Sequence, residues 1–234
     1  MDFSILEKRL GVKFKDRSLL KQALTHRSYV NENRAWPLGH NERLEFLGDA
    51  VLELIVTDFL YRKYPSEQEG LLTFYRSGLV NITVLADVAT GLDLNAFLLM
   101  AKGEAKDTGR ARQVILGNAV EAIIGALYIG QGYEAARQFG VKFLLPRVDE
   151  IIARGLWRDS KSQLQEAAQK HLGMTPAYEV LEQSGPDHNR QFLVGVYFGS
   201  DLVAKGQGGA KQLAEAEAAK AALTLKGWDT ATAA

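Results

Sequence analysis

The chain has 234 residues, of which 47% are hydrophobic and 24% charged, and it is long enough for one large domain or two modest ones. It contains no cysteine, which excludes a disulfide scaffold, a cysteine-ligated metal site and a cysteine nucleophile. The 28 basic residues balance the 28 acidic ones, so the basic excess typical of nucleic-acid-binding proteins is missing. Charged residues interrupt the N-terminal segment, and no apolar run approaches the roughly 18 residues of a membrane span. We therefore expect a soluble, cytoplasmic protein with no membrane partner.

Residues 1–152 are predicted to form an all-α domain. Apolar residues recur at helical spacing in 6–24, 44–55 and 79–85. Residues 114–129 are apolar almost all round, which indicates a helix that is buried on most of its faces. No strand-like alternation of useful length interrupts this half of the chain.

The pattern changes near residue 155. We interpret residues 153–158 as a linker, 159–228 as a small α+β domain and 229–234 as a disordered tail. The order of elements in the second domain is α-β-β-β-α, in about 70 residues. In chain order, the sequence predicts a helix over 160–172, strands over 177–182, 191–198 and 202–205, and a helix over 210–225.

Four acidic residues are expected along one stripe of the helix that contains 44–55. Like charges at this spacing destabilise a helix by roughly a few tenths of a kcal/mol per pair. If the stripe faced the protein interior, a cation would have to lie against it. On spacing alone, a solvated acidic face is an equally good interpretation. The four residues are Glu42, Glu45, Asp49 and Glu53.

A second acidic position favours a metal site. Glu121 is the only charged residue in the apolar run 114–129, and Asn118 lies one turn before it. A carboxylate in such a run must be neutralised by a proton, a salt bridge or a metal. Oxygen ligands from two helices suit a hard cation such as Mg²⁺, and the absence of His and Cys from both segments disfavours zinc.

The segment NERLEFLGDA (41–50) closely resembles the signature of bacterial ribonuclease III, a double-stranded-RNA endonuclease. The resemblance covers nearly the whole chain, and its second half is similar to the double-stranded-RNA-binding domain of that family. In the first half it is supported by LTHRSYVNE (24–32), EGLLTFYRSGLVN (69–81), KGE (102–104) and ILGNAVEAIIGALY (115–128). In the second half the matching segments are DSKSQLQE (159–166), GPDHNRQF (185–192) and GGAKQLAEAEAA (208–219).

The resemblance implies that the helical domain forms a homodimer and binds Mg²⁺ beside an RNA strand, with Mn²⁺ able to substitute. The metal would activate the water that hydrolyses the phosphodiester bond and would stabilise charge on the leaving 3′ oxygen. Products would carry 5′-phosphates, and the paired cuts would be staggered to leave short 3′ overhangs. The implied roles are in the processing of ribosomal and messenger RNA.

The resemblance also assigns roles to individual residues of the first half. Phe46 would lie at the dimer contact. Glu42 and Glu69 are either secondary acids near the RNA or metal, or solvated surface residues. Asp49 and Glu121 are the implied catalytic residues. The implied metal ligands are Glu45, Asp49, Asn118 and Glu121.

Asn118 departs from the family pattern, which has Asp at this position. The amide oxygen can still bind a metal or a metal-bound water, but one negative charge is lost and Mg²⁺ affinity should fall. Three explanations are open: a natural variant, a deliberate substitution that slows cleavage, or a catalytically impaired homodimer kept for binding double-stranded RNA. Because Glu45, Asp49 and Glu121 are all present, we favour a natural, active enzyme.

In the second domain, the resemblance implies a surface that reads the phosphates and 2′-hydroxyls of an RNA duplex. Lys211 would bind phosphate at the start of the last helix, where the family has two or three basic residues. Here Lys211 is followed by Gln212 and Leu213, with Lys205 nearby in sequence. Fewer phosphate contacts predict weaker binding and a shallower salt dependence than in a basic relative. Gln165 and Glu166 alone would be ordinary surface residues, and His188 alone could be a turn histidine that caps local amides. The implied RNA contacts are Ser162, Gln165, Glu166, His188 and Lys211.

Overall fold

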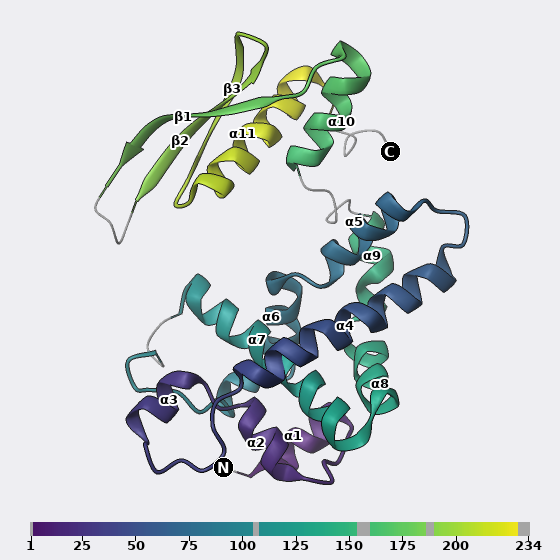
Figure 1. Ribbon diagram of the computed structural model, residues 1–234, viewed down its shortest axis with the longest axis vertical. Coiled ribbons are helices and arrows are strands. Elements are labelled where there is room, and N and C mark those ends of the chain that lie inside the picture. The colour runs from purple at the N-terminus through teal and green to yellow at the C-terminus, as the bar shows by residue number, and fades with distance from the viewer. Residues whose placement is uncertain (1, 105–107, 154–159, 186–189, 229–234) are drawn as a thin grey trace. The chain divides into compact units, whose positions relative to one another are not determined.

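The computed structural model describes residues 2–104, 108–153, 160–185 and 190–228. The chain divides into two units, Met1–Ala153 and Arg154–Ala234. The first unit is helical and the second combines two helices with a three-stranded sheet, which confirms the predicted fold class (Figure 1). The predicted tail and nearly all of the predicted linker lie outside the described residues, so they stay predictions.

The first unit is built from α-helices and short 3₁₀ turns (Figure 1). Several begin where a short polar side chain caps the free backbone N–H groups, as Asp2, Asp16 and Asn81 do. In chain order the elements are α1 (Phe3–Leu10), α2 (Arg17–Ala23), α3 (Arg27–Glu32), α4 (Glu42–Lys63), α5 (Glu69–Leu79), α6 (Ile82–Gly91), the 3₁₀ turn η1 (Leu94–Ala96), α7 (Arg110–Gln131), α8 (Tyr133–Phe143), the 3₁₀ turn η3 (Leu145–Arg147) and α9 (Val148–Ala153).

Helix α7 forms the core of the first unit, as its apolar sequence predicts. Nearly every residue from Ile115 to Leu127 is buried, and α4, α6, α8 and α2 all pack against it. Of the helices that the structure describes, α7 alone is long and apolar enough to cross a membrane by length and composition. Most of it is buried inside this unit, which is typical of a core helix.

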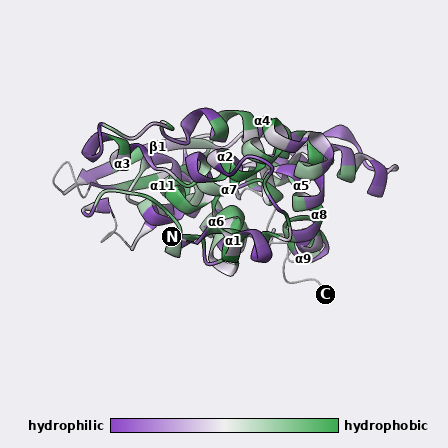
Figure 2. Ribbon diagram, turned by 90° about the horizontal axis from the view of Figure 1, so that it is seen from below, coloured by the Kyte–Doolittle hydropathy of each residue, from purple (hydrophilic) through white to green (hydrophobic). Residues whose placement is uncertain are grey.

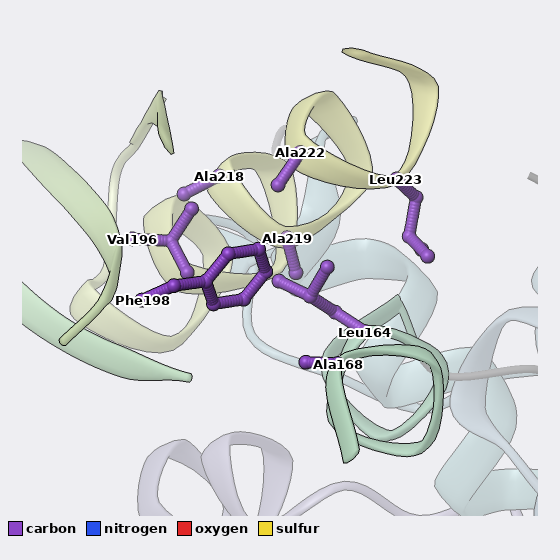
Figure 3. Packing of buried hydrophobic residues seen from close by; sticks show 8 residues of the cluster. All are labelled: Leu164, Ala168, Val196, Phe198, Ala218, Ala219, Ala222 and Leu223. Carbon is purple, nitrogen blue, oxygen red and sulfur yellow. The ribbon is translucent and has the colours of Figure 1, made fainter. Parts of the chain in front are cut away.

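The second unit consists of α10 (Ser160–Leu172), the strands β1 (Ala177–Ser184), β2 (Gln191–Phe198) and β3 (Asp201–Gly208), and α11 (Lys211–Lys226). The strands form an antiparallel sheet in the order β1-β2-β3, with one irregularity in each pairing. Val196 and Phe198 of β2 point at the alanine-rich face of α11 and at Leu164 of α10 (Figure 3). Both helices therefore pack against one face of the sheet.

The sequence pattern explains how these elements bury their apolar faces. In β2 the alternating residues Val194, Val196 and Phe198 are almost fully buried, as the period of a half-buried strand predicts. Coloured by hydropathy, the ribbons of both units change between hydrophobic and hydrophilic stretches (Figure 2). Packing of amphipathic helices and strands, rather than cross-links, holds this cysteine-free chain together.

Candidate active site and RNA-binding surface

The candidate active site lies where α4 and α7 cross with their backbones in contact. A Cβ added to Gly48 of α4 would overlap the backbone carbonyl of Glu121 and lie 2.9 Å from the backbone nitrogen of Gly125. A Cβ added to Gly125 would overlap the carbonyl of Leu44 and lie 3.1 Å from the backbone nitrogen of Gly48. Two glycines thus allow the helices to approach far more closely than side chains would permit.

This close crossing brings the predicted ligands of the two helices together. Glu45 and Asp49 lie one turn apart on α4 on either side of Gly48, and Asn118 and Glu121 lie one turn apart on α7. Glu45, Asn118 and Glu121 are half-buried, whereas Asp49 is exposed. The side-chain amide of Asn118 is a hydrogen-bond partner of the Glu45 carboxylate. The site is therefore enclosed by the helix crossing and open to solvent at Asp49.

The carboxylates of the site lie close together in a partly buried environment, and both conditions shift their pKa values. Burial, together with the charges of Asp49 and Glu45, raises the pKa of Glu121 to about 7. Burial also raises the pKa of Glu45, with smaller contributions from Glu42 and Asp49, while the hydrogen bond from Asn118 opposes the shift. Without a cation, the site thus holds protons near neutral pH that an ordinary carboxyl would have released.

The chemistry of this donor set fits a hard divalent cation. Three carboxylates and one amide oxygen are available, and neither helix contributes a His or Cys to the site. Within the described part of the chain, however, no three His, Cys, Asp or Glu side chains converge as a preformed metal cluster. Such partial convergence suits Mg²⁺, which usually keeps several waters and takes one or two carboxylates plus a substrate phosphate.

The other acids of the predicted stripe and Glu69 do not join this site within one chain. Glu42 is exposed, and its carboxylate lies 3.6 Å from Arg27 Nη1 and 3.7 Å from His40 Nδ1. Glu53 is exposed further along α4. Glu69 begins α5 after the far end of α4, and the α4 residues from Glu45 to Lys63 span about 27 Å.

Sequence reasoning missed the residues that position the site. Asn41 is buried just before α4, where its side chain donates to the carbonyl of Ala23 at 3.3 Å and its backbone N–H donates to Thr25 at 2.9 Å. These bonds fix the start of α4 to the end of α2. Gly48 and Gly125 set the helix separation, as described above. The available signal was a glycine inside each of two long apolar helices, since such a glycine usually marks a close approach.

A row of exposed apolar side chains runs along α4 beside the site. Phe46 is 82% exposed, Leu54 56% and Tyr61 72%, and their spacing puts all three on one side of the helix. Single exposed apolar residues are common, whereas several on one side of a helix make a candidate interaction surface. We call these three residues the α4 apolar row.

The predicted RNA contacts of the second unit occupy the solvent face of α10 and the start of α11. Gln165 and Glu166 are exposed and Ser162 is half-buried. Ser162 and Glu166 lie on the side of α10 opposite the buried Leu164, and Gln165 lies at the flank. Lys211 is exposed at the first position of α11. His188 lies outside the described residues, so its role stays a prediction.

Lys205 belongs to a different surface of this unit. Its neighbour Gly206 faces α11 so closely that an added Cβ would lie 2.7 Å from the backbone carbon of Glu217. Because adjacent strand residues point to opposite faces, the Lys205 side chain extends from the face of the sheet that the helices leave uncovered. Nearness in sequence does not place Lys205 beside Lys211.

Comparison with known proteins agrees with both units. Residues 16–148 match the family described as Ribonuclease-III-like, and residues 160–225 match the double-stranded RNA binding motif. A protein named Ribonuclease 3 from Pelotomaculum thermopropionicum is 46% identical over 94% of this chain and 91% of its own length. Its counterpart from Bdellovibrio bacteriovorus is 45% identical over 94% of each chain.

The first unit is also similar to solved structures. The nuclease domain of ribonuclease III from Campylobacter jejuni superimposes with a TM-score of 0.56 at 40% identity, over 61% of this chain and 95% of that domain. That structure is described as flexible in a region involved in dimer formation. These relatives are more than 40% identical to this chain along most of its length, and both of its units match the corresponding domain families. The chain belongs to the ribonuclease III family, with a helical nuclease domain followed by a double-stranded-RNA-binding domain.

Proposed function

We propose that this protein is an endonuclease that hydrolyses phosphodiester bonds in double-stranded RNA, using Mg²⁺ or, as a substitute, Mn²⁺. The observation that carries the proposal is the meeting of Glu45, Asn118 and Glu121 at a helix crossing, in a chain that also has a double-stranded-RNA-binding domain. Family membership supports the same reaction. Its products would be staggered ends with 5′-phosphates.

The proposed cation ligands are Glu45, Asp49, Asn118 and Glu121. When bound, a divalent cation supplies a water of lowered pKa and stabilises negative charge on the leaving oxygen. The exposed position of Asp49 supports its role as the ligand nearest to the approaching RNA. With Asp49 in this role, the RNA phosphate would approach from the open side of the site, and the helix crossing would exclude water from the other side.

Two side chains of the site control its protonation and geometry. Glu121 keeps a proton near neutral pH when the site lacks a cation, so binding a cation would release that proton. Asn118 hydrogen-bonds the Glu45 carboxylate and so restricts its orientation before a cation arrives. An Asp at position 118 would repel Glu45 instead, which supports a positioning role for the amide in this chain.

We further propose that the protein is a homodimer that uses the α4 apolar row as its contact. The exposure of Phe46 supports this role, because a ring that is 82% exposed contributes little to the fold of one chain. Processing of ribosomal and messenger RNA in the cytoplasm is the corresponding cellular role.

The proposal is tested by incubating the protein with a long, end-labelled RNA duplex in Mg²⁺ and in Mn²⁺. We expect Glu45→Gln and Glu121→Gln to abolish cutting but to leave duplex retention on a filter nearly unchanged. Glu53→Gln is the matched control, since Glu53 lies on the same helix but is exposed and away from the crossing.

The outcomes separate catalysis from binding alone. Retention of the duplex without any cutting by the unmodified protein in either metal would identify a binding homodimer rather than a nuclease. Loss of both cutting and retention in the Glu45 and Glu121 variants would mean that these residues support the fold rather than the reaction.

A further inference from the structure

Lys161 and Lys211, from the two helices of the RNA-binding domain, share one buried carboxylate. Glu215 of α11 is 9% exposed and is one of the few charged residues buried in the described structure. Lys161 Nζ donates to its Oε2 at 2.6 Å, and Lys211 Nζ lies 3.9 Å from its Oε1. The three side chains therefore form a small ionic cluster at the start of α11.

The two lysines are held to different degrees. The Lys161 ammonium group also lies over the Tyr178 ring, 5.0 Å from its centroid, and its side chain is 37% exposed. The Lys211 side chain is 58% exposed, and its longer separation from Glu215 makes a weak ion pair. Lys161 is thus held between Glu215 and the Tyr178 ring, whereas Lys211 can turn towards a ligand in solvent.

A buried carboxylate such as Glu215 is stabilised by a neighbouring cation or by a bound proton, because an unpaired buried charge is strongly destabilising. If Lys161 did not pair with Glu215, Lys211 would be the next cation within reach, one helical turn away. Lys211 would then be held at Glu215, and its charge would be cancelled at the place where an RNA phosphate is expected to bind.

We propose that Lys161 is a positioning residue for RNA binding, which neutralises Glu215 and thereby keeps Lys211 available for the phosphate backbone. The inference rests on the proposed role of Lys211. It explains how a domain with few basic residues at this helix start retains a usable positive charge there. Lys161 acts through Glu215 and makes no contact with the RNA itself.

The test is a double-mutant cycle on the full-length protein in EDTA, with a labelled RNA duplex of about 16 base pairs, the span that such domains cover. Affinity is measured at several salt concentrations, since the slope of log K against log [salt] counts the phosphates neutralised. We expect Lys161→Gln to weaken binding as much as Lys211→Gln does, each with a slope shallower by about one.

The second substitution in the cycle distinguishes positioning from direct contact. Removing the carboxylate as well, in Lys161→Gln/Glu215→Gln, should restore both the affinity and the slope of the unmodified protein. Adding Lys211→Gln to Lys161→Gln should cause no further loss. Lys161→Arg keeps the charge next to Glu215 and should bind normally.

Lys205→Gln is the matched control for removing one positive charge, because Lys205 extends from the uncovered face of the sheet. It should leave the salt slope unchanged. Thermal unfolding of each variant shows whether the domain is folded at the assay temperature, and Lys161→Arg keeps the test usable if Lys161→Gln unfolds.

Two results would overturn the proposal. One is normal binding by Lys161→Gln, and the other is a Lys161→Gln/Glu215→Gln variant that binds as weakly as Lys161→Gln alone. If Lys211→Gln itself leaves binding unchanged, the assigned role of Lys211 fails first, so the two failures are distinguishable.

Discussion

Gly48 and Gly125 face each other across the crossing of α4 and α7, and a Cβ on either would lie about 3 Å from the backbone nitrogen of the other (2.9 and 3.1 Å). The contact places Glu45 and Asp49 beside Glu121, although the two segments are more than 70 residues apart in the chain. The separation of the two helices therefore decides whether the acids can act on one cation.

Substituting Gly48 should damage the fold and the site together. In Gly48→Ala the new methyl group would overlap the carbonyl of Glu121, so the helices must separate. We expect the free energy of unfolding to fall by about 3 kcal/mol, the upper part of the usual range for overpacking, and cleavage to be lost. Urea denaturation measures the first effect and duplex cleavage the second.

Gly70→Ala is the matched control for that substitution. Gly70 also lies in a helix, but nothing would lie within 4 Å of an added Cβ. Because Ala favours helix, this variant should be unchanged or more stable by up to about 1 kcal/mol. Equal destabilisation of both variants would contradict the role assigned to the helix crossing.

Replacing Asn118 by Asp should tighten cation binding and weaken the metal-free fold. The added charge attracts a divalent cation, but it also removes the amide hydrogen bond to Glu45 and puts a third repelling charge beside Glu45 and Glu121. We expect the Mg²⁺ concentration for half-maximal cleavage to fall and the thermal midpoint in EDTA to decrease.

Asn118→Ala separates the two contributions of Asn118, since it removes the hydrogen bond without adding charge. It should weaken both cation binding and cleavage. Tighter Mg²⁺ binding by Asn118→Ala than by Asn118→Asp would show that the side chain at this position is not a ligand.

The raised pKa of Glu121 predicts a pH-dependent stability in the absence of metal. With a pKa of about 7 against an ordinary 4.5, the folded protein binds a proton that the unfolded chain has lost. This contribution to stability is complete below pH 4.5 and is lost as the pH rises through 7. Glu121→Gln keeps the neutral form, so in EDTA it should be more stable than the unmodified protein at pH 8.

The size of that effect follows from the shift in pKa. A shift of this size corresponds to a difference of roughly 3 kcal/mol in the free energy of unfolding, which partial solvent access reduces to about 2 kcal/mol. Urea denaturation at pH 8 and at pH 4.5 measures it, and the difference between the proteins should nearly vanish at the lower pH. A stabilisation of equal size at both pH values would point to packing rather than to the charge.

Phe46→Asp should dissociate the proposed homodimer without unfolding the chain. The ring is 82% exposed, so its removal costs little within one chain, while a carboxylate in an apolar contact is costly. We expect sedimentation analysis to show a shift towards monomer and the thermal midpoint of the monomer to change little. Val114→Asp is a suitable comparison, since Val114 is exposed on α7, outside the α4 apolar row.

Much of the organisation could be predicted from local pattern. The helix over 114–129, buried at most positions from Ile115 to Leu127, follows from its apolar composition, and the face shared by Val194, Val196 and Phe198 follows from strict alternation. Both patterns have a short period that one segment reveals by itself. The signature at 41–50 likewise identified the family, and the match along nearly the whole chain confirms it.

What local pattern could not supply was the relation between distant residues. The spacing of Glu42, Glu45, Asp49 and Glu53 gives one acidic stripe, yet Glu45 is half-buried beside Asn118 while Glu42 lies near Arg27. Lys205 likewise lies near Lys211 in sequence, but it extends from the face of the sheet that the helices leave uncovered.

The balance of basic and acidic residues in this chain has the same explanation. Residues 1–155 hold 20 basic and 19 acidic residues, and residues 156–234 hold 8 and 9, so neither half of the chain carries a large basic excess. Tertiary structure decides which of those charges act, because an ion pair such as Lys161 with Glu215 depends on a few ångströms of separation and on burial. The residue types and their periods were readable in the chain alone, but the pairing of charges required the packing of its helices.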